Sequence, residues 1–255
     1  MRYYIIVFSF FSIFAISSCQ DLILGPDEAK PPLPFKHSTR LTTYLDSMRY
    51  ALELPALAAA IISDTGIIEA AAVGSRRYGG PLNVTNSDVF LPGSCAKSFT
   101  AVLAGLLIDE GKLSWTTTLA EIFPEYSNKM RSEYHEVNML DLLSHSAGFL
   151  YNPDLTFHSS SPRDLRLEVV SWALVQPPAT QRGKPLYSNV GFIIAGAIAE
   201  KLADRTYEEQ VIEKILRPLG ITTAGFGQIG TVGLEDQPLE HTPNHSPIIT
   251  APQNS

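Results

Sequence analysis

The segment from Ser94 to Glu110 places the strongest constraint on the fold of this chain, because it is apolar on nearly every side of a helix. Its apolar side chains are Phe99, Ala101, Val102, Leu103, Ala104, Leu106, Leu107 and Ile108. A surface helix has one apolar face, whereas a helix that is apolar all round has to be enclosed by other elements. Gly111 follows the segment, as glycine commonly does after the last helical turn. We therefore expect a helix that runs through the middle of a globular domain.

The region before this segment predicts one helix and one β-hairpin. Apolar residues recur at helical spacing over residues 41–52, and Pro55 closes this first helix. Two apolar runs, residues 56–63 and 67–73, surround the turn Asp64-Thr65-Gly66. Apolar runs on both sides of a short Asp-x-Gly turn are typical of a β-hairpin.

The region after the apolar segment predicts three further helices. The first covers residues 138–144 and the second covers residues 190–202, where Ile and Ala dominate. Thr206 and Glu209 have the spacing of a capping box that begins the third, and Pro218 ends it. The order of helix, hairpin and helices predicts a domain of the α/β (α+β) class.

The first eighteen residues have the pattern of a secretory signal peptide. Arg2 is followed by an apolar run over residues 3–16, which is shorter than a comfortable membrane-spanning helix. The ending Ile16-Ser17-Ser18-Cys19 resembles the bacterial lipobox, in which the cysteine is lipidated and becomes the new N-terminus. We predict a signal peptide over residues 1–18 and a lipid on Cys19. The alternative is an ordinary signal peptide that happens to contain a cysteine.

A lipid on Cys19 predicts a protein of the bacterial cell envelope, anchored to the membrane on its periplasmic or surface face. Residues 19–38 are proline-rich and unpatterned, which suits a tether between the anchor and a folded domain at residues 39–255. Cys95 is the second of the two cysteines in the sequence, so lipidation of Cys19 leaves no disulfide in the mature chain.

Charge and motif content disfavour three other classes of function. The net charge of −7 and the absence of a basic stripe argue against a nucleic-acid partner. The sequence contains no G-x-S-x-G, which disfavours an α/β-hydrolase. His241 and His245 are weak metal candidates, because Pro243 prevents a shared helix face and no cysteine or carboxylate cluster joins them. We predict no metal and no cofactor.

The sequence Gly93-Ser94-Cys95-Ala96-Lys97 carries the strongest chemical signal. A serine hydroxyl is a poor nucleophile until a neighbouring base takes its proton. If Ser94 begins the apolar helix, Lys97 lies one turn further on the same face and is a candidate for that base. The helix N-terminus also favours the negative charge of an oxyanion. The alternative is a serine cap followed by a surface lysine.

Two further motifs accompany this one. Tyr187-Ser188-Asn189 directly precedes a predicted helix, and by itself it is typical of a Ser/Asn cap after a proline-containing loop. The other is the run from Leu142 to Phe149, which contains His145. A single histidine is usually structural, and the sequence offers no Asp partner beside His145.

Together these motifs resemble the serine β-lactamase-like superfamily, in the branch of class C β-lactamases, DD-peptidases and related esterases. They occur in the order of that family, over about residues 39–227: Asp88-Val89-Phe90, Ser94-Cys95-Ala96-Lys97, Gly111-Lys112-Leu113, Leu142-Leu143-Ser144-His145-Ser146-Ala147-Gly148, Tyr187-Ser188-Asn189 and Arg217-Pro218-Leu219-Gly220-Ile221. The resemblance implies a β-lactamase/transpeptidase-like fold, in which the first helix and the hairpin join a central antiparallel sheet beside a large helical region.

The resemblance also implies roles for individual residues. Ser94 is acylated, Lys97 and Tyr187 share the general-base and general-acid steps, and Asn189 hydrogen-bonds the substrate side chain. His145 is structural and holds the loop beneath the site. The implied substrate is a small molecule or a peptidoglycan-like compound, namely a β-lactam, a D-Ala-D-Ala peptide or a small ester.

The sequence departs from the family in one element. The family carries a Lys-Thr-Gly or His-x-Gly triplet on a late strand of the sheet, and neither follows Gly227 here. We therefore interpret the chain as the N-terminal two-thirds of such an enzyme, with the C-terminal strands missing and the edge of the hairpin unpaired. The alternative function is that of a truncated, catalytically deficient pseudoenzyme or binding protein tethered to the membrane.

Overall fold

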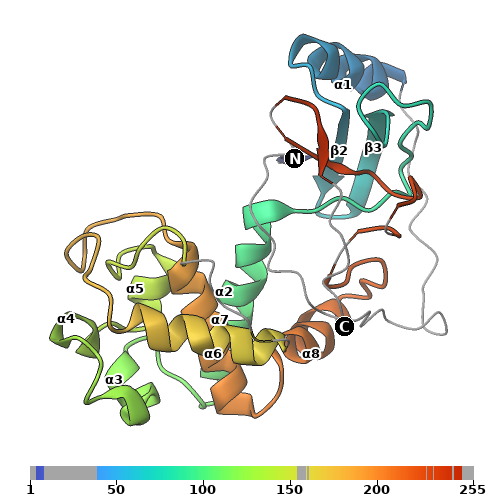
Figure 1. Cartoon of the computed structure of the whole chain (residues 1–255). Coiled ribbons are helices and arrows are strands. Elements are labelled where there is room, and N and C mark those ends of the chain that lie inside the picture. The colour runs from blue at the N-terminus through green and yellow to red at the C-terminus, as the bar shows by residue number, and fades with distance from the viewer. Residues whose placement is uncertain are drawn as a thin grey trace. The chain divides into compact units, whose positions relative to one another are not determined.

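A computed structural model describes residues 4–8, 39–153, 159, 161–227, 229–231, 233–242 and 244–248, with only the backbone described for residues 4–8 and 248. The predicted lipidation site Cys19 and the predicted tether up to residue 38 lie outside the described residues. The described residues form two compact units (Figure 1). The sheet unit contains residues 4–8, 39–95 and the part from 227 onward, and the helical unit contains residues 96–226.

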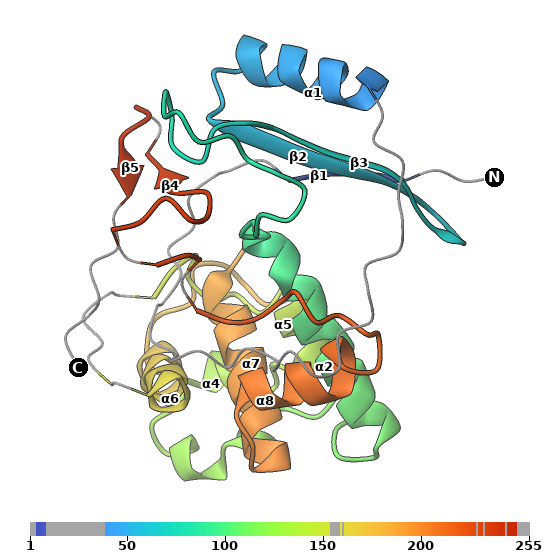
Figure 2. The same ribbon diagram turned by 90° about the vertical axis from the view of Figure 1, so that its right-hand side faces the viewer.

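The sheet unit begins its globular part with the predicted helix and hairpin. Helix α1 (Thr39–Ala51) packs along strands β2 (Ala56–Ser63) and β3 (Gly66–Gly74), as Figure 2 shows. The register pairs Ala56 with Gly74 and Ser63 with Gly66, so the strands are joined by a tight turn. The core between helix and strands is small and apolar; its buried residues are Leu45, Leu57, Ala59, Ala71 and Val73. The helix and hairpin predictions are confirmed.

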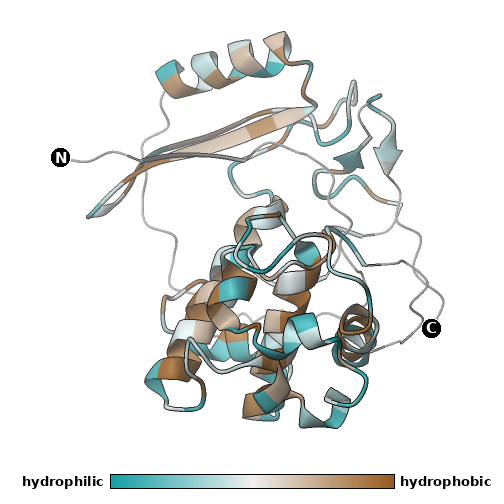
Figure 3. Cartoon of the chain, turned by 90° about the vertical axis from the view of Figure 1, so that its left-hand side faces the viewer, coloured by the Kyte–Doolittle hydropathy of each residue, from teal (hydrophilic) through white to brown (hydrophobic). Residues whose placement is uncertain are grey.

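The contact between α1 and the hairpin is apolar but narrow. In Figure 3 the hairpin is coloured mainly in hydrophobic and neutral tones, whereas α1 carries many hydrophilic residues. Leu45 is the buried residue of α1, and Tyr44 and Leu52 of the predicted apolar stripe are each 59% exposed. The helix therefore covers the sheet through a narrower contact than its sequence pattern indicates.

A third strand, β1 (Tyr4–Phe8), lies at the outer edge of β2. The two strands are antiparallel, with Tyr4 opposite Ile62 and Phe8 opposite Ala58. The sequence predicts an unpaired hairpin edge, and for the edge of β2 this prediction is wrong. Backbone groups of β1 satisfy the edge of β2, and β1 comes from residues of the predicted signal peptide. Cleavage of such a peptide would remove this strand.

The C-terminal part of the sheet unit folds back on the loop that follows β3. It contains the short strands β4 (Glu240–His241) and β5 (Pro247–Ile248), which pair with each other. The backbone N–H of Tyr78 donates to His241 Nε2 at 2.9 Å, and the N–H of Val89 donates to Gln237 Oε1 at 2.7 Å. These contacts join positions about 150 residues apart, which no local sequence pattern indicates.

The helical unit consists of helices joined by turns and by longer loops, such as the one between Ala173 and Asn189. They are α2 (Lys97–Asp109), α3 (Leu119–Ile122), α4 (Ser132–His135), α5 (Met139–Leu143), α6 (Pro162–Ala173), α7 (Asn189–Ala203) and α8 (Tyr207–Val211), with the 3-10 turn Pro124–Tyr126 and the π-helical turn Ile212–Leu216. The capping box of Thr206 and Glu209 begins α8 as predicted. No helix in the described part of the chain has the length and apolar character needed to cross a bilayer.

Helix α7, rather than α2, is the most enclosed element of this unit. The segment 94–110 does form a helix, but α2 begins at Lys97 and leaves Val102 49% exposed. Helix α7 contacts α2, α5 and α6. Its buried residues are Val190, Gly191, Ile194, Ala195, Gly196, Ala197, Ile198, Ala199 and Glu200. The expectation that α2 runs through the middle of the domain is therefore corrected.

Candidate active site

The proposed nucleophile lies in a 3-10 turn (Gly93–Ala96) that leads into α2. Gly93 adopts φ +52°, a left-handed conformation that glycine accepts without strain. Ser94 is half-buried and Cys95 is exposed. Ser94 belongs to the sheet unit, and Lys97, the first residue of α2, belongs to the helical unit.

Lys97 lies against two aromatic rings. Its Nζ is 5.0 Å from the ring centroid of Tyr187 and 5.5 Å from that of Phe192. An ammonium within about 6 Å of a ring face is attracted by the ring's electrons. The structure thus brings together Lys97 and Tyr187, two of the predicted site residues, and half-buries the lysine. The alternative of an exposed surface lysine is not what the structure shows.

Asn189 is the first residue of α7, and the cap of that helix is its neighbour Ser188. Ser188 Oγ accepts from the N–H of Gly191 at 3.0 Å and donates to Leu150 O at 2.6 Å. The helix-cap interpretation is therefore correct for Ser188. Asn189 has a different role: its Nδ2 donates to Asn152 Oδ1 at 2.7 Å, and its Oδ1 is buried without a hydrogen-bond partner in the described structure.

His145 supports the segment that carries Tyr187. Its Nδ1 accepts from the N–H of Ser188 at 3.1 Å, and its ring lies 4.3 Å from the Tyr187 ring. Burial, and secondly the positive charge of Lys97, lower the pKa of His145 below its ordinary value. This contact agrees with the supporting position that the family resemblance implies.

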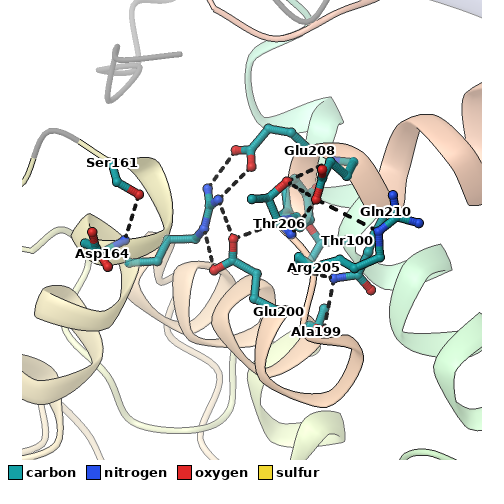
Figure 4. Close-up of polar contacts among 12 residues, drawn as sticks. Thr100, Ser161, Asp164, Ala199, Glu200, Arg205, Thr206, Glu208 and Gln210 are labelled. Carbon is teal, nitrogen blue, oxygen red and sulfur yellow. Dashed lines mark hydrogen bonds and ion pairs between the residues drawn. The ribbon is translucent and has the colours of Figure 1, made fainter. Parts of the chain in front are cut away.

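An ion cluster joins α6, α7 and α8 within the helical unit (Figure 4). Arg166 donates to Glu200 at 2.7 and 3.1 Å and to Glu208 at 2.8 and 2.9 Å. Burial opposes the charge of Arg166, but the hydrogen bonds to both carboxylates outweigh it and raise the pKa of Arg166. Tyr207 lies between this cluster and α2, because its hydroxyl is 2.9 Å from Thr100 Oγ1. The cluster therefore supports the helices that carry Lys97 and Asn189.

Within the described residues, no group of three or more potential metal ligands comes together. Of the two weak candidates, His241 accepts the Tyr78 N–H and His245 stacks on the Tyr78 ring with centroids 4.0 Å apart. Both histidines thus have structural contacts in the sheet unit.

The match of residues 43–252 to the family model for β-lactamase identifies the family. This chain belongs to the β-lactamase family. The resemblance found in the motifs is thereby confirmed, and the helices and small antiparallel sheet are those of a β-lactamase/transpeptidase-like fold.

Individual relatives of this β-lactamase-family protein differ widely. It is 32% identical over 149 residues to an unguisins hydrolase of Aspergillus campestris, covering 54% of this chain and 27% of the relative. It is 28% identical over 193 residues to penicillin-binding protein 4 of Amycolatopsis lactamdurans, covering 74% and 49%. A class C β-lactamase structure aligns at a TM-score of 0.69 and 19% identity, covering 85% of this chain and 60% of that one. The chain thus spans at most about half the length of these curated relatives.

Two residues of the site were missed by the sequence analysis. Asn152 bonds Asn189, and Phe192 contacts Lys97. Asn152 lies in the stretch 151–184, which has no readable pattern, and Phe192 is one of many apolar residues in α7. The signal that could have found Phe192 is its position one helical turn after Ser188, on the side where the motif begins.

Proposed function

We propose that this protein is a serine hydrolase that forms an acyl-enzyme on Ser94. The observation that carries the proposal is the position of Lys97 at the start of α2, with its ammonium beside the Tyr187 ring. A lysine and a tyrosine held together can exchange a proton with a serine hydroxyl and with a leaving group. Membership in the β-lactamase family supports the same assignment.

In the proposed reaction, Ser94 Oγ attacks the substrate carbonyl and gives its proton to the Lys97–Tyr187 pair. The pair then protonates the departing nitrogen or oxygen as its bond to the carbonyl carbon breaks. Water attacks the resulting ester, the pair takes a proton from the water, and Ser94 Oγ leaves as the restored hydroxyl. Protons therefore balance over the two half-reactions, and no cofactor is needed.

We propose a β-lactam, a D-Ala-D-Ala peptide or a small ester as the substrate. The name of the penicillin-binding relative supports the peptidoglycan-like choice. Asn189 and Asn152 offer a donor and an acceptor that bond each other at 2.7 Å. This pair is complementary to an amide, which has one N–H and one C=O, so that a substrate side chain can replace their mutual bond.

The test is labelling with a fluorescent penicillin and with a fluorophosphonate, followed by peptide mapping. We expect the adduct on Ser94 and no adduct in Ser94→Ala. Lys97→Ala should abolish labelling and leave the helical circular dichroism signal unchanged. Ser98→Ala is the matched control, because Ser98 is an exposed serine of the same helix. Labelling that persists in Ser94→Ala refutes the assignment.

The alternative candidate is a membrane-tethered pseudoenzyme that binds a partner. In the family, a Lys-Thr-Gly or His-x-Gly triplet lies on the strand with the second oxyanion donor, and residues 228–255 contain neither triplet. Loss of one such donor costs about a hundred- to a thousandfold in rate. A folded chain that takes no label from either probe would support this alternative over the hydrolase.

A further inference from the structure

His145 fixes both residues that flank Tyr187. The backbone carbonyl of His145 accepts from the N–H of Leu186 at 2.8 Å, and its ring Nδ1 accepts from the N–H of Ser188 at 3.1 Å. The Tyr187 ring packs on the His145 ring between these two bonds. One residue therefore bonds the backbone on each side of Tyr187, and on the Ser188 side it acts together with the bond from Ser188 Oγ to Leu150 O.

The bond from Ser188 also defines the protonation state of the ring. A ring nitrogen that accepts from a backbone N–H carries no proton, so His145 is neutral with its proton on Nε2. An imidazolium would direct an N–H of its own against the Ser188 N–H. Protonation therefore removes one of the two bonds by which His145 holds the Tyr187 segment.

The surroundings of the ring oppose its protonation. The charged group that acts on it is Lys97 of α2, and the other titratable group facing it is Tyr187. Phe192 of α7 packs on the ring at 5.0 Å and is uncharged. Asp141 and Arg182, of the neighbouring helix and loop, pair with each other at 2.7 Å. A positive His145 would thus lose hydration through burial and be repelled by Lys97, which are the two causes that lower its pKa.

We propose that His145 is a positioning residue that makes the placement of Tyr187 depend on pH, so that the site is assembled only when His145 is neutral. The inference rests on the proposed function for its effect on catalysis, but the coupling between His145 and the Tyr187 segment can be tested without turnover. The expected consequence is a site that is disabled by mild acid.

Two substitutions separate the contribution of the Nδ1 acceptor of His145 from that of its aromatic ring. His145→Asn keeps an oxygen acceptor near the position of Nδ1, and asparagine tolerates the left-handed backbone that His145 adopts at φ +58°. His145→Phe keeps an aromatic ring but has no acceptor. His135→Asn is the matched control, because His135 belongs to the same unit and bonds Met130 O instead of the Tyr187 segment.

The first experiment is an NMR titration of the 255-residue chain. We expect the Ser188 amide resonance to shift with the same midpoint as the His145 ring, below pH 6.5, and to lose this titration in His145→Asn but not in His135→Asn. A Ser188 amide that does not follow the His145 ring, or a His145 midpoint at or above pH 6.5, overturns the inference. This readout is independent of whether Ser94 reacts.

The second experiment is the pH profile of Ser94 acylation by the fluorescent penicillin. His145→Asn should keep the wild-type rate at pH 7.5 within a few-fold and move the acid limb to lower pH. His145→Phe should lower the rate about ten- to a hundredfold at saturating probe, because Tyr187 is misplaced rather than lost. An unchanged acid limb in His145→Asn contradicts the coupling, whereas absence of label in the wild type contradicts the proposed function.

Discussion

Replacement of Arg166 by methionine should destabilise the helical unit more than any other single charge removal in it. Arg166 is the partner of two carboxylates whose side chains are 2% and 9% exposed, those of Glu200 and Glu208. Methionine has similar length but cannot donate, so both carboxylates would stay buried without their cation. Removing one partner of a buried ion pair costs about 3–5 kcal/mol of stability, because the other charge stays buried without compensation. The net contribution of the intact pair to stability is much smaller.

The size of this loss can be measured against a control in the same unit. A domain has a total unfolding free energy of about 5–15 kcal/mol, so a loss of this size removes a large fraction of it. At about 2–4 °C per kcal/mol for a chain of this length, Tm should fall by about 6–20 °C. Arg131→Met breaks the pair with Glu133 at 2.8 Å, where the side chains are 41% and 42% exposed. That variant should lose at most about 1 kcal/mol.

The assay is thermal and urea unfolding followed by circular dichroism at 222 nm, which reports the helices. The triple variant Arg166→Met, Glu200→Met, Glu208→Leu removes the three buried charges together and should regain most of the unfolding free energy that Arg166→Met loses. It should not regain all of it, because the Tyr207 N–H also loses its acceptor on Glu200, which lies at 3.0 Å. If the Tm of Arg166→Met equals that of Arg131→Met within experimental error, burial of the carboxylates does not raise the cost of removing Arg166.

Three further predictions follow from the other parts of the chain. Expression in bacteria with labelled palmitate should mark the wild type and not Cys19→Ser, whereas an unlabelled product in the periplasm would indicate an ordinary signal peptide. Removal of residues 1–19 takes away β1 and exposes the edge of β2, so a chain that starts at residue 20 should aggregate more by light scattering and melt at a lower temperature by calorimetry; an unchanged melting temperature would contradict this role of β1. Burial raises the pKa of Tyr134 to about 12, so stability should fall as pH rises from 10 through 12, and Tyr134→Phe should lessen that fall, to which the raised pKa values of Tyr126 and Tyr207 also contribute. By removing an unpartnered buried hydroxyl, Tyr134→Phe should also add about 1 kcal/mol in urea unfolding at pH 8.

Local chemistry was enough to predict most of the elements. The hairpin follows from the turn at Asp64-Thr65-Gly66, and the start of α8 follows from the capping box of Thr206 and Glu209. Such signals act between residues three or four positions apart, and the bonds they indicate form in almost any tertiary context. The spacing of Ser94 and Lys97 is equally local, which is why the family could be recognised from the motifs.

Tertiary structure decided which helix is enclosed and which edge is covered. The apolar pattern of α2 predicts full burial, but the burial of a helix depends on which elements surround it. Helix α7 is surrounded by more of the neighbouring helices than α2 is. Likewise, residues 4–8 have the apolar composition of a leader and also that of a strand. Their pairing with β2 depends on a partner about fifty or more positions away.

The arrangement of the site was also decided by tertiary structure. The motif order predicts that Lys97 and Tyr187 act together, but it does not indicate that Phe192 contacts the ammonium or that Asn152 bonds Asn189. It does not indicate either that the ring of His145 accepts from a backbone amide 43 positions away. Sequence specifies which groups can donate, accept or carry charge. Packing of α2 and α7 against the loops before them decides which of those groups meet, because contacts over such separations form only when the whole unit folds.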